Sequence, residues 1–220
     1  MLFLKFGIVL LTKSDRNGHG LFNLVVEYYL KQSSSILHIG AHFGQEAEYY
    51  HNLGKPVLWI EANTETFLQL ASNISKFHNQ IALNLLAGSK NEIVNFYVTS
   101  NRGLSSSALN LSQLGKEAWK IDVTEIRNYK ATPLDQVQEI EQLGCDFWVI
   151  DVQGFELEVI HGAKKVINQA KYLLVECSDE DFYESSARYS AVKTELEGIG
   201  FAPILPVRGN HFEMLFCRTS

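Results

Sequence analysis

Residues 36–46, with the sequence ILHIGAHFGQE, constrain the fold of this chain more than any other stretch. The apolar start predicts a short buried strand, and Gly40 then begins a turn. Residues from about 44 to 53 have the apolar spacing of a helix that ends at Gly54. Such a strand–turn–helix unit places backbone N–H groups at the carboxyl end of a parallel strand, where open α/β sheets bind nucleotide-like ligands. The stretch therefore predicts an α/β fold with a ligand-binding loop at one strand end.

An acidic residue follows the next predicted strand, residues 57–60. Glu61 lies 21 residues after Gly40 (61 − 40). An acid about 20 residues after such a turn is typical of a site for a ribose-bearing cofactor, because a carboxylate accepts hydrogen bonds from two neighbouring hydroxyls. Without this acid, the glycines would equally well indicate a tight turn in a buried βα unit. Glu61 therefore favours a cofactor.

The glycine pattern indicates which cofactor. A dinucleotide site needs the pattern G-x-G-x-x-G, whose second glycine lets the backbone approach the pyrophosphate. Here the three positions are Gly40, His42 and Gln45, and a histidine would crowd a pyrophosphate. The spacing that remains, Gly40 to Gly44, suits a ligand with a ribose but no diphosphate. S-adenosylmethionine is the commonest such ligand, and a nicotinamide oxidoreductase is disfavoured.

The rest of the chain alternates between strand-like and helix-like apolar patterns. Further strands are predicted at residues 81–86, 93–98, 121–129, 147–152 and 172–177, with 93–98 pairing back as a hairpin. Helices are predicted at residues 21–30, 63–74, 133–143, 155–170 and about 192–199, and residues 99–120 as a polar loop. Residues 201–205 and 213–217 predict a terminal hairpin. We expect one domain, residues 1–220, with a doubly wound sheet that is parallel except at one edge and with residues 1–32 as an N-terminal extension.

Composition narrows the classes of partner and compartment. A net charge of −6 argues against a surface that tracks nucleic-acid phosphates. Three widely spaced cysteines, Cys145, Cys177 and Cys217, are typical of buried thiols in a reducing compartment, so we expect the cytoplasm. The apolar N-terminus, residues 1–11, contains Lys5 and is too short to span a bilayer. We therefore expect it to pack on the core, with no stable membrane insertion.

Six segments taken in order resemble the FkbM-type family of S-adenosylmethionine-dependent methyltransferases, over roughly residues 33–205. They are HIGAHFGQE, WIEAN, SNRGLSSS, TPLDQV, DVQGFELEVIHGA and LLVEC. The fifth, residues 151–163, is the most specific. The resemblance implies a Rossmann-like class I methyltransferase fold and methyl transfer, usually to a hydroxyl of a sugar, glycan or other small natural product. His42 departs from the family, which more often has asparagine at that position.

Position along the chain assigns the cofactor-binding residues. Backbone from Gly40 to Gly44 should hold the amino-acid end of S-adenosylmethionine, and Glu61 its ribose. Two further segments should flank the adenine. The full set is Gly40, Ala41, His42, Gly44, Gln45, Glu61, Ala62, Asn63, Ala87 and Ser89.

Asp151 is the best candidate for the chemical step. It ends an almost purely apolar strand, where burial would raise its pKa toward that of a useful base. Alternatively, it caps the following helix, to whose first turn Glu156 belongs. Glu176 ends the next strand and should lie near Asp151. The two acids could orient a polyol, or hold a divalent metal with water and substrate oxygens, although no third ligand is evident and we assign no metal site.

The acceptor pocket is expected to involve the polar loop and the turn after Asp151. The candidate residues are Asn101, Arg102, Ser105, Ser106 and Gln153. Serine hydroxyls suit the hydroxyls of a sugar, but an ordinary solvated loop would have the same composition. Besides an O-methyltransferase, the sequence leaves open a catalytically inactive binding protein with the same fold. A nucleic-acid methyltransferase is disfavoured by the acidic balance.

Overall fold

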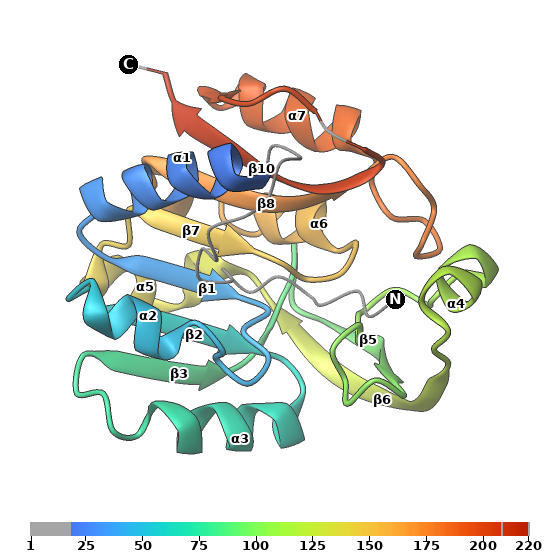
Figure 1. The fold of residues 1–220 in the computed structure, drawn as a ribbon. Helices are drawn as coiled ribbons and strands as arrows, with labels where there is room; N and C mark the ends of the chain where they lie inside the picture. Colours follow the sequence, from blue (N-terminus) through green and yellow to red (C-terminus); the bar gives the residue numbers. More distant parts are fainter. Residues whose placement is uncertain (1–18, 208, 220) are drawn as a thin grey trace.

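The computed structural model describes residues 19–207 and 209–219, and its main element is a seven-stranded sheet (Figure 1). The strand order is β3-β2-β1-β7-β8-β10-β9. In that order the strands are Gln80–Asn84, Val57–Glu61, Ile36–Ile39, Phe147–Ile150, Tyr172–Ser178, His211–Arg218 and Phe201–Pro203. The first five run parallel, whereas β10 is antiparallel to both of its neighbours. The predicted doubly wound sheet with a C-terminal antiparallel hairpin is therefore confirmed.

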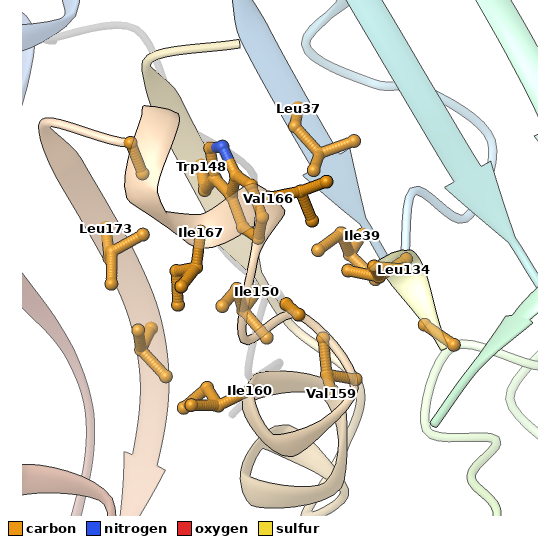
Figure 2. Packing of buried hydrophobic residues seen from close by; sticks show 14 of the residues in the cluster. Leu37, Ile39, Leu134, Trp148, Ile150, Val159, Ile160, Val166, Ile167 and Leu173 are labelled. Carbon is orange, nitrogen blue, oxygen red and sulfur yellow. The ribbon is translucent and has the colours of Figure 1, made fainter. Parts of the chain in front are cut away.

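Each face of the sheet carries its own apolar core, because successive side chains of a strand point to opposite faces. Ile36 belongs to the core beneath α1 (His19–Gln32), α2 (Ala47–Asn52) and α3 (Thr64–Ile74). Its neighbour Leu37 belongs to the opposite core, which Figure 2 shows around Trp148. The elements on that face are η1 (Leu134–Gln136), α5 (Gln138–Leu143), α6 (Glu156–His161), η2 (Val166–Gln169) and α7 (Tyr189–Gly198). Helices on both faces explain the fully buried strands β1, β2 and β7.

A second, three-stranded sheet lies beside the carboxyl ends of the main strands (Figure 1). It consists of β4 (Leu86–Ala87), β6 (Val123–Thr132) and β5 (Glu92–Thr99), and α4 (Gln113–Trp119) lies between β5 and β6 in the chain. The expectation that residues 93–98 pair back as a hairpin was wrong. β5 instead pairs antiparallel with β6, which follows it in the chain, along the whole length of β5. The pairing joins segments separated by a long connection, which local turn signals do not reveal.

The predicted helix over residues 155–170 is broken in the structure. It consists of α6, a turn at Gly162, and the 3-10 helix η2. A Cβ atom on Gly162 would lie 2.0 Å from the carbonyl oxygen of Gly88, so this turn packs directly against the backbone of another segment. That contact is non-local, which explains why helical periodicity alone predicted one continuous helix.

The predicted helix at residues 21–30 is part of α1. The expected packing of residues 1–11 falls outside the described residues. Within residues 19–207 and 209–219, no helix combines the length and the apolar character needed to cross a bilayer.

A substitution at Gly40 tests how closely the end of β1 packs against the end of β7. A Cβ atom at this residue would lie 1.8 Å from the carbonyl oxygen of Asp151, and its φ of +83° already favours glycine. We expect Gly40→Ala to lower the free energy of unfolding by about 3 kcal/mol or more, or to prevent folding. The matched control is Gly54→Ala, because Gly54 has a φ of +70° and open space around it. The control should lose only about 1 kcal/mol in urea unfolding, and equal losses would contradict the steric argument.

Candidate active site

The loop after β1 contains two glycines that packing requires. Gly40 and Ala41 donate their backbone N–H groups to the carbonyl oxygen of Ile60, at 2.9 and 3.1 Å, which ties the loop to β2. Gly44 has a φ of +68°, and a Cβ atom there would lie 2.6 Å from Leu70 Cδ1 of α3. The loop is thus closely packed between β2, β7 and α3, at the carboxyl ends of the strands.

Glu61 ends β2 directly beside this loop and is only 8% exposed. Its Oε2 accepts the backbone N–H of His42 and its Oε1 that of Asn63, both at 2.8 Å. Asn63 caps α3 by accepting the backbone N–H of Glu65. These two N–H groups fix the orientation of the carboxylate, and its contact with ribose hydroxyls stays a prediction. The structure therefore brings the predicted residues 40–45 and 61–63 together.

His42 joins the loop after β1 to the turn at residues 99–107. Its Nδ1 lies 2.9 Å from Gln45 Nε2, and its Nε2 lies 3.2 Å from the carbonyl oxygen of Arg102. Because the amide nitrogen of Gln45 can only donate, Nδ1 accepts and Nε2 carries the proton that is donated to Arg102. The histidine thus has a local structural partner on each side.

The predicted acceptor residues of the turn at 99–107 bond mainly to one another. Asn101 accepts from the Thr99 hydroxyl at 2.7 Å and donates to Ser105 Oγ at 3.0 Å, while Ser106 Oγ accepts the backbone N–H of Thr99. The guanidinium of Arg102 lies over the ring of Phe43. These contacts give the turn its shape, and its role in binding an acceptor stays a prediction.

Ala87 and Ser89 lie in and just after β4. Ala87 is 3% exposed and pairs with Thr132 of β6. Leu85, two residues before Ala87, donates its backbone N–H to the carbonyl oxygen of Glu61 at 3.1 Å. Residues 85–89 therefore run from the end of β2, at Glu61, into the second sheet. Their contact with adenine stays a prediction.

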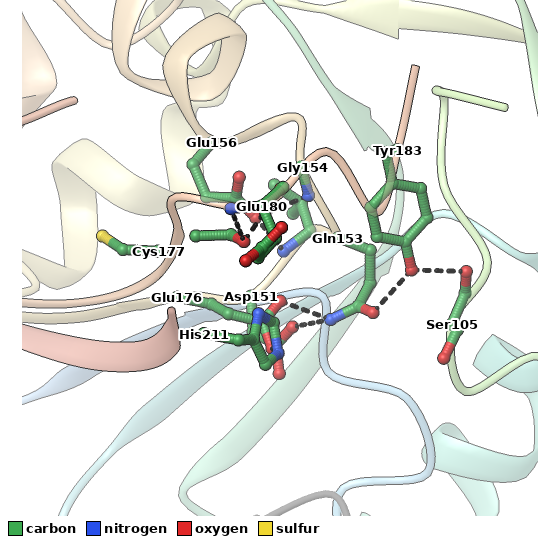
Figure 3. Close-up of polar contacts among 12 residues, drawn as sticks. Ser105, Asp151, Gln153, Gly154, Glu156, Glu176, Cys177, Glu180, Tyr183 and His211 are labelled. Atoms are coloured by element: carbon green, nitrogen blue, oxygen red, sulfur yellow. Dashed lines mark hydrogen bonds and ion pairs between the residues drawn. The ribbon is translucent and has the colours of Figure 1, made fainter. Parts of the chain in front are cut away.

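The two predicted acids meet at one amide group (Figure 3). Gln153, which is 4% exposed, donates from Nε2 to Asp151 Oδ1 and to Glu176 Oε2, both at 2.5 Å. Its Oε1 lies 2.8 Å from the hydroxyl of Tyr183, which donates. The structure thus brings Asp151 and Glu176 together, as predicted, and it places Gln153 between them. We call this group, Asp151, Gln153, Glu176 and Tyr183, the acid–amide cluster.

Two further carboxyl groups next to the acid–amide cluster have strongly raised pKa values. Glu156 begins α6, is 4% exposed, and accepts the backbone N–H groups of Val152 and Gly154 at 3.3 and 3.0 Å. Burial, and then repulsion by Glu176, raises the pKa of Glu156 to about 8. Glu213 lies opposite Glu176 in the β8–β10 pair, and burial followed by repulsion from Asp151 raises its pKa to about 8 as well.

A small pocket opens beside these groups. Its polar and aromatic walls include Glu156, Glu176, Glu180, Phe182, Tyr183 and His211. His211 Nε2 lies 3.2 Å from Glu176 Oε1. Burial alone would lower the pKa of His211, but the hydrogen bond and negative charge of Glu176 outweigh it and raise that pKa. A substrate in this pocket would therefore meet both hydrogen-bond acceptors and a hydrogen-bond donor.

Sequence reasoning missed Tyr183, His211 and Glu213 as members of this site. The pairing of β10 with β8 brings His211 and Glu213 to the strand ends, whereas Tyr183 comes from the loop after β8 and is placed by its contacts with Gln153 and Ser105. Glu156 could have been found, since it stands in the DVQGFE string at the start of a predicted helix. Within the part of the chain that the structure describes, no group of three or more His, Cys, Asp or Glu side chains is arranged to hold a metal ion.

Comparisons with solved structures identify the fold class. An S-adenosylmethionine-dependent methyltransferase from Aquifex aeolicus has a TM-score of 0.52 at 14% identity, over 93% of this chain and 94% of that one. The magnesium protoporphyrin IX methyltransferase from Synechocystis PCC 6803, with bound SAH, has a TM-score of 0.51 at 9% identity, over 96% and 91%. The ribosomal protein L11 methylase from Lactobacillus delbrueckii subsp. bulgaricus has a TM-score of 0.51 at 13% identity, over 96% and 82%. The fold is therefore that of class I methyltransferases.

The family follows from the sequence itself. The model of the methyltransferase FkbM domain matches residues 38–203, and this chain belongs to that family. A search of curated proteins found no match. The resemblance stated from the six sequence segments is thus confirmed, and with it the assignment to methyltransferases.

Glu156 provides a test of the site's electrostatics through protein stability. Its pKa is higher in the folded than in the unfolded chain, so the folded state holds its proton while the unfolded state releases it. Stability should therefore fall as pH rises from about 4.5 to about 8. Glu156→Gln keeps an oxygen for the two backbone N–H groups and removes this loss, so its advantage over wild type should grow across the same range, reaching a few kcal/mol at pH 8.

Urea unfolding of both proteins at pH 5 and pH 8 measures this effect. Glu158→Gln, two residues later on the same helix and half-buried, is the control and should follow wild type. A stability difference between Glu156→Gln and wild type that does not change with pH would contradict the assignment.

Proposed function

We propose that this methyltransferase transfers the methyl group of S-adenosylmethionine to a hydroxyl of a sugar, glycan or other small natural product. The observation that carries the proposal is the position of Asp151 and Glu176. Their carboxylates lie at neighbouring strand ends, next to the β1 loop on one side and the pocket on the other. An alcohol must lose its proton during methyl transfer, and a placed carboxylate supplies the base.

The methyl donor would lie along the carboxyl ends of β1 and β2. Backbone groups of residues 40–45 would hold its amino-acid end, and Glu61, already fixed by two N–H donors, would accept the ribose hydroxyls. Class I methyltransferases use S-adenosylmethionine, and the Synechocystis enzyme was crystallised with SAH on this fold. When bound, the sulfonium supplies an electrophilic methyl group.

The chain's own contribution to the reaction is orientation and proton removal. Methyl transfer requires the acceptor oxygen in line with the bond between the sulfur and the methyl carbon, near contact distance. With the donor held at the loop after β1, the acceptor would approach from the side of the acid–amide cluster. Asp151 follows β7, directly beside the β1 loop, whereas Glu176 faces the pocket. Asp151 is therefore the proposed base, and Glu176 the residue that orients the acceptor with His211.

The cofactor assignment is tested by calorimetric titration with S-adenosylmethionine and with NADH. We expect binding of the first only, and Glu61→Gln should weaken it about 10- to 100-fold, because one ribose acceptor is replaced by a donor. Glu65→Gln is the matched control: this acid lies four residues later, on α3, is exposed, and contacts Arg127. NADH binding, or an affinity that Glu61→Gln leaves unchanged, would contradict the proposed site.

Asp151→Asn separates binding from chemistry. We expect the affinity for S-adenosylmethionine to stay within about threefold, while turnover falls at least about 100-fold because the base is lost. Tritium transfer from [methyl-³H]S-adenosylmethionine to a panel of monosaccharides, oligosaccharides and polyhydroxylated small molecules measures turnover. Asp122→Asn, an exposed aspartate, is the control. Unchanged turnover in Asp151→Asn would remove this residue from the chemistry, and loss of transfer after chelation with EDTA would favour a metal-dependent mechanism.

A further inference from the structure

Resting on the methyltransferase function proposed above, we propose that Gln153 is a positioning residue. Its amide holds the carboxylates of Asp151 and Glu176 in one arrangement. Gln153 also links them to the two covering loops, which are the loop after β5 that contains Ser107 and the loop after β8 that contains Tyr183. The sequence suggested a direct contact between Gln153 and the acceptor. The buried side chain and its hydrogen bonds instead point to a role that acts through the two acids.

The backbone at Gln153 has a left-handed conformation, and its side chain contacts the acids at the ends of β7 and β8. Gln153 has a φ of +61° and the next residue, Gly154, a φ of +94°. A left-handed conformation is strained for a residue that carries a Cβ atom. The hydrogen bonds of the Gln153 side chain to two carboxylates offset this cost, since bonds to charged groups are the stronger kind. Glycine would avoid the strain here but would leave the acids without this donor.

The orientation of the amide follows from the chemistry of its neighbours. Each hydrogen of the amide nitrogen serves one carboxylate, at 2.5 Å. With the amide turned over, its oxygen would face two carboxylate oxygens at the same distance, which is repulsive. The oxygen therefore faces Tyr183, whose single hydroxyl hydrogen is shared between this oxygen, at 2.8 Å, and the carbonyl oxygen of Ser105, at 2.9 Å. The two carboxylates, rather than Tyr183, therefore set the orientation of the amide.

Gln153 also contacts both covering loops. Ser107, 1% exposed, donates from Oγ to the carbonyl oxygen of Gln153 at 2.8 Å. Tyr183 comes from the loop after β8, and an isolated β-bridge joins it to Leu111 of the segment after β5 (Figure 3 shows Tyr183 between Ser105 and Gln153). A displacement of either loop would therefore reach the two acids through Gln153.

Several charged and titratable groups face the pair Asp151 and Glu176 from the surrounding elements. They are His38 of β1, Glu156 of α6, His211 and Glu213 of β10, and Tyr183 of the covering loop. Two of these are carboxyl groups, whose repulsion opposes ionisation of the pair, whereas the amide donors of Gln153 stabilise the ionised form. Removing the amide donors should make the pair hold a proton to higher pH.

Titration of side-chain carboxyl carbons by ¹³C NMR tests the inference without an acceptor. In Gln153→Met, which keeps the chain length and removes both donors, the Asp151 and Glu176 signals should titrate about 1 to 2 pH units higher than in wild type. Asp151→Asn and Glu176→Gln assign the signals. The matched control is Gln80→Met: Gln80 is also buried and bonds to Trp59 and to the carbonyl of Ala47, away from the acids. This control should lose stability but keep the wild-type titration.

Gln153→Asn guards against misfolding, because asparagine tolerates the left-handed backbone and its amide is too short to bridge the acids. It should shift the titration in the same direction as Gln153→Met. Wild-type titration in both variants would overturn the positioning role. Failure of wild-type protein to bind S-adenosylmethionine would instead overturn the proposed function, and calorimetry of the same wild-type sample reports that separately.

Discussion

The close parallel pairing of β1 and β7 is the constraint on which the site depends. It continues one residue beyond the strand ends, where Asp151 donates its backbone N–H to the carbonyl of Ile39 and leaves no room for a Cβ atom at Gly40. This contact sets the candidate base directly beside the candidate cofactor loop. The neighbouring strands then extend the site on both sides, with β2 adding Glu61 and β8 adding Glu176. A methyl donor and a base must lie within contact distance of one acceptor atom, and parallel strand ends at one edge provide that geometry.

The second sheet and the loop after β8 complete the site beyond the carboxyl ends of the main strands. Neither belongs to the alternating βα pattern, yet both reach Gln153, through Ser107 and Tyr183. His42 makes a comparable link from the cofactor loop to the carbonyl of Arg102. The turn at residues 99–107 is therefore held at two points, one at each substrate of the proposed reaction. This arrangement explains why its serines and asparagine bond to one another: a turn anchored at both ends needs a fixed shape between the anchors.

The sequence predicted the parts of this structure that depend on local pattern. Buried strands, the glycine turn and the acids at strand ends all follow from periodicity, and in a parallel sheet the acids Glu61, Asp151 and Glu176 must fall at one edge. The pairing of β5 with β6 was not predictable in this way, because its partner lies beyond a long connection. The break at Gly162 depends on the backbone of Gly88, and the place of Tyr183 depends on Gln153. Each of these failures concerns a contact between segments distant in sequence, for which one sequence carries no periodic signal.

The concentration of acids at the strand ends also has a consistent electrostatic explanation. Like charges opposite one another in a sheet destabilise it, and the β8–β10 pair places Glu176 opposite Glu213. Burial and repulsion raise the pKa of Glu213 and of Glu156 to about 8, so each of these two acids holds a proton over much of the neutral range. Asp151 and Glu176 instead receive hydrogen bonds from a shared amide, and Glu176 also pairs with His211. Glu156 and Glu213 thus favour the protonated form, even though Glu156 accepts two backbone N–H groups. A protonated carboxyl group cannot act as the base for an alcohol, which directs the proposed chemistry to Asp151 and Glu176, the two acids that share the amide of Gln153.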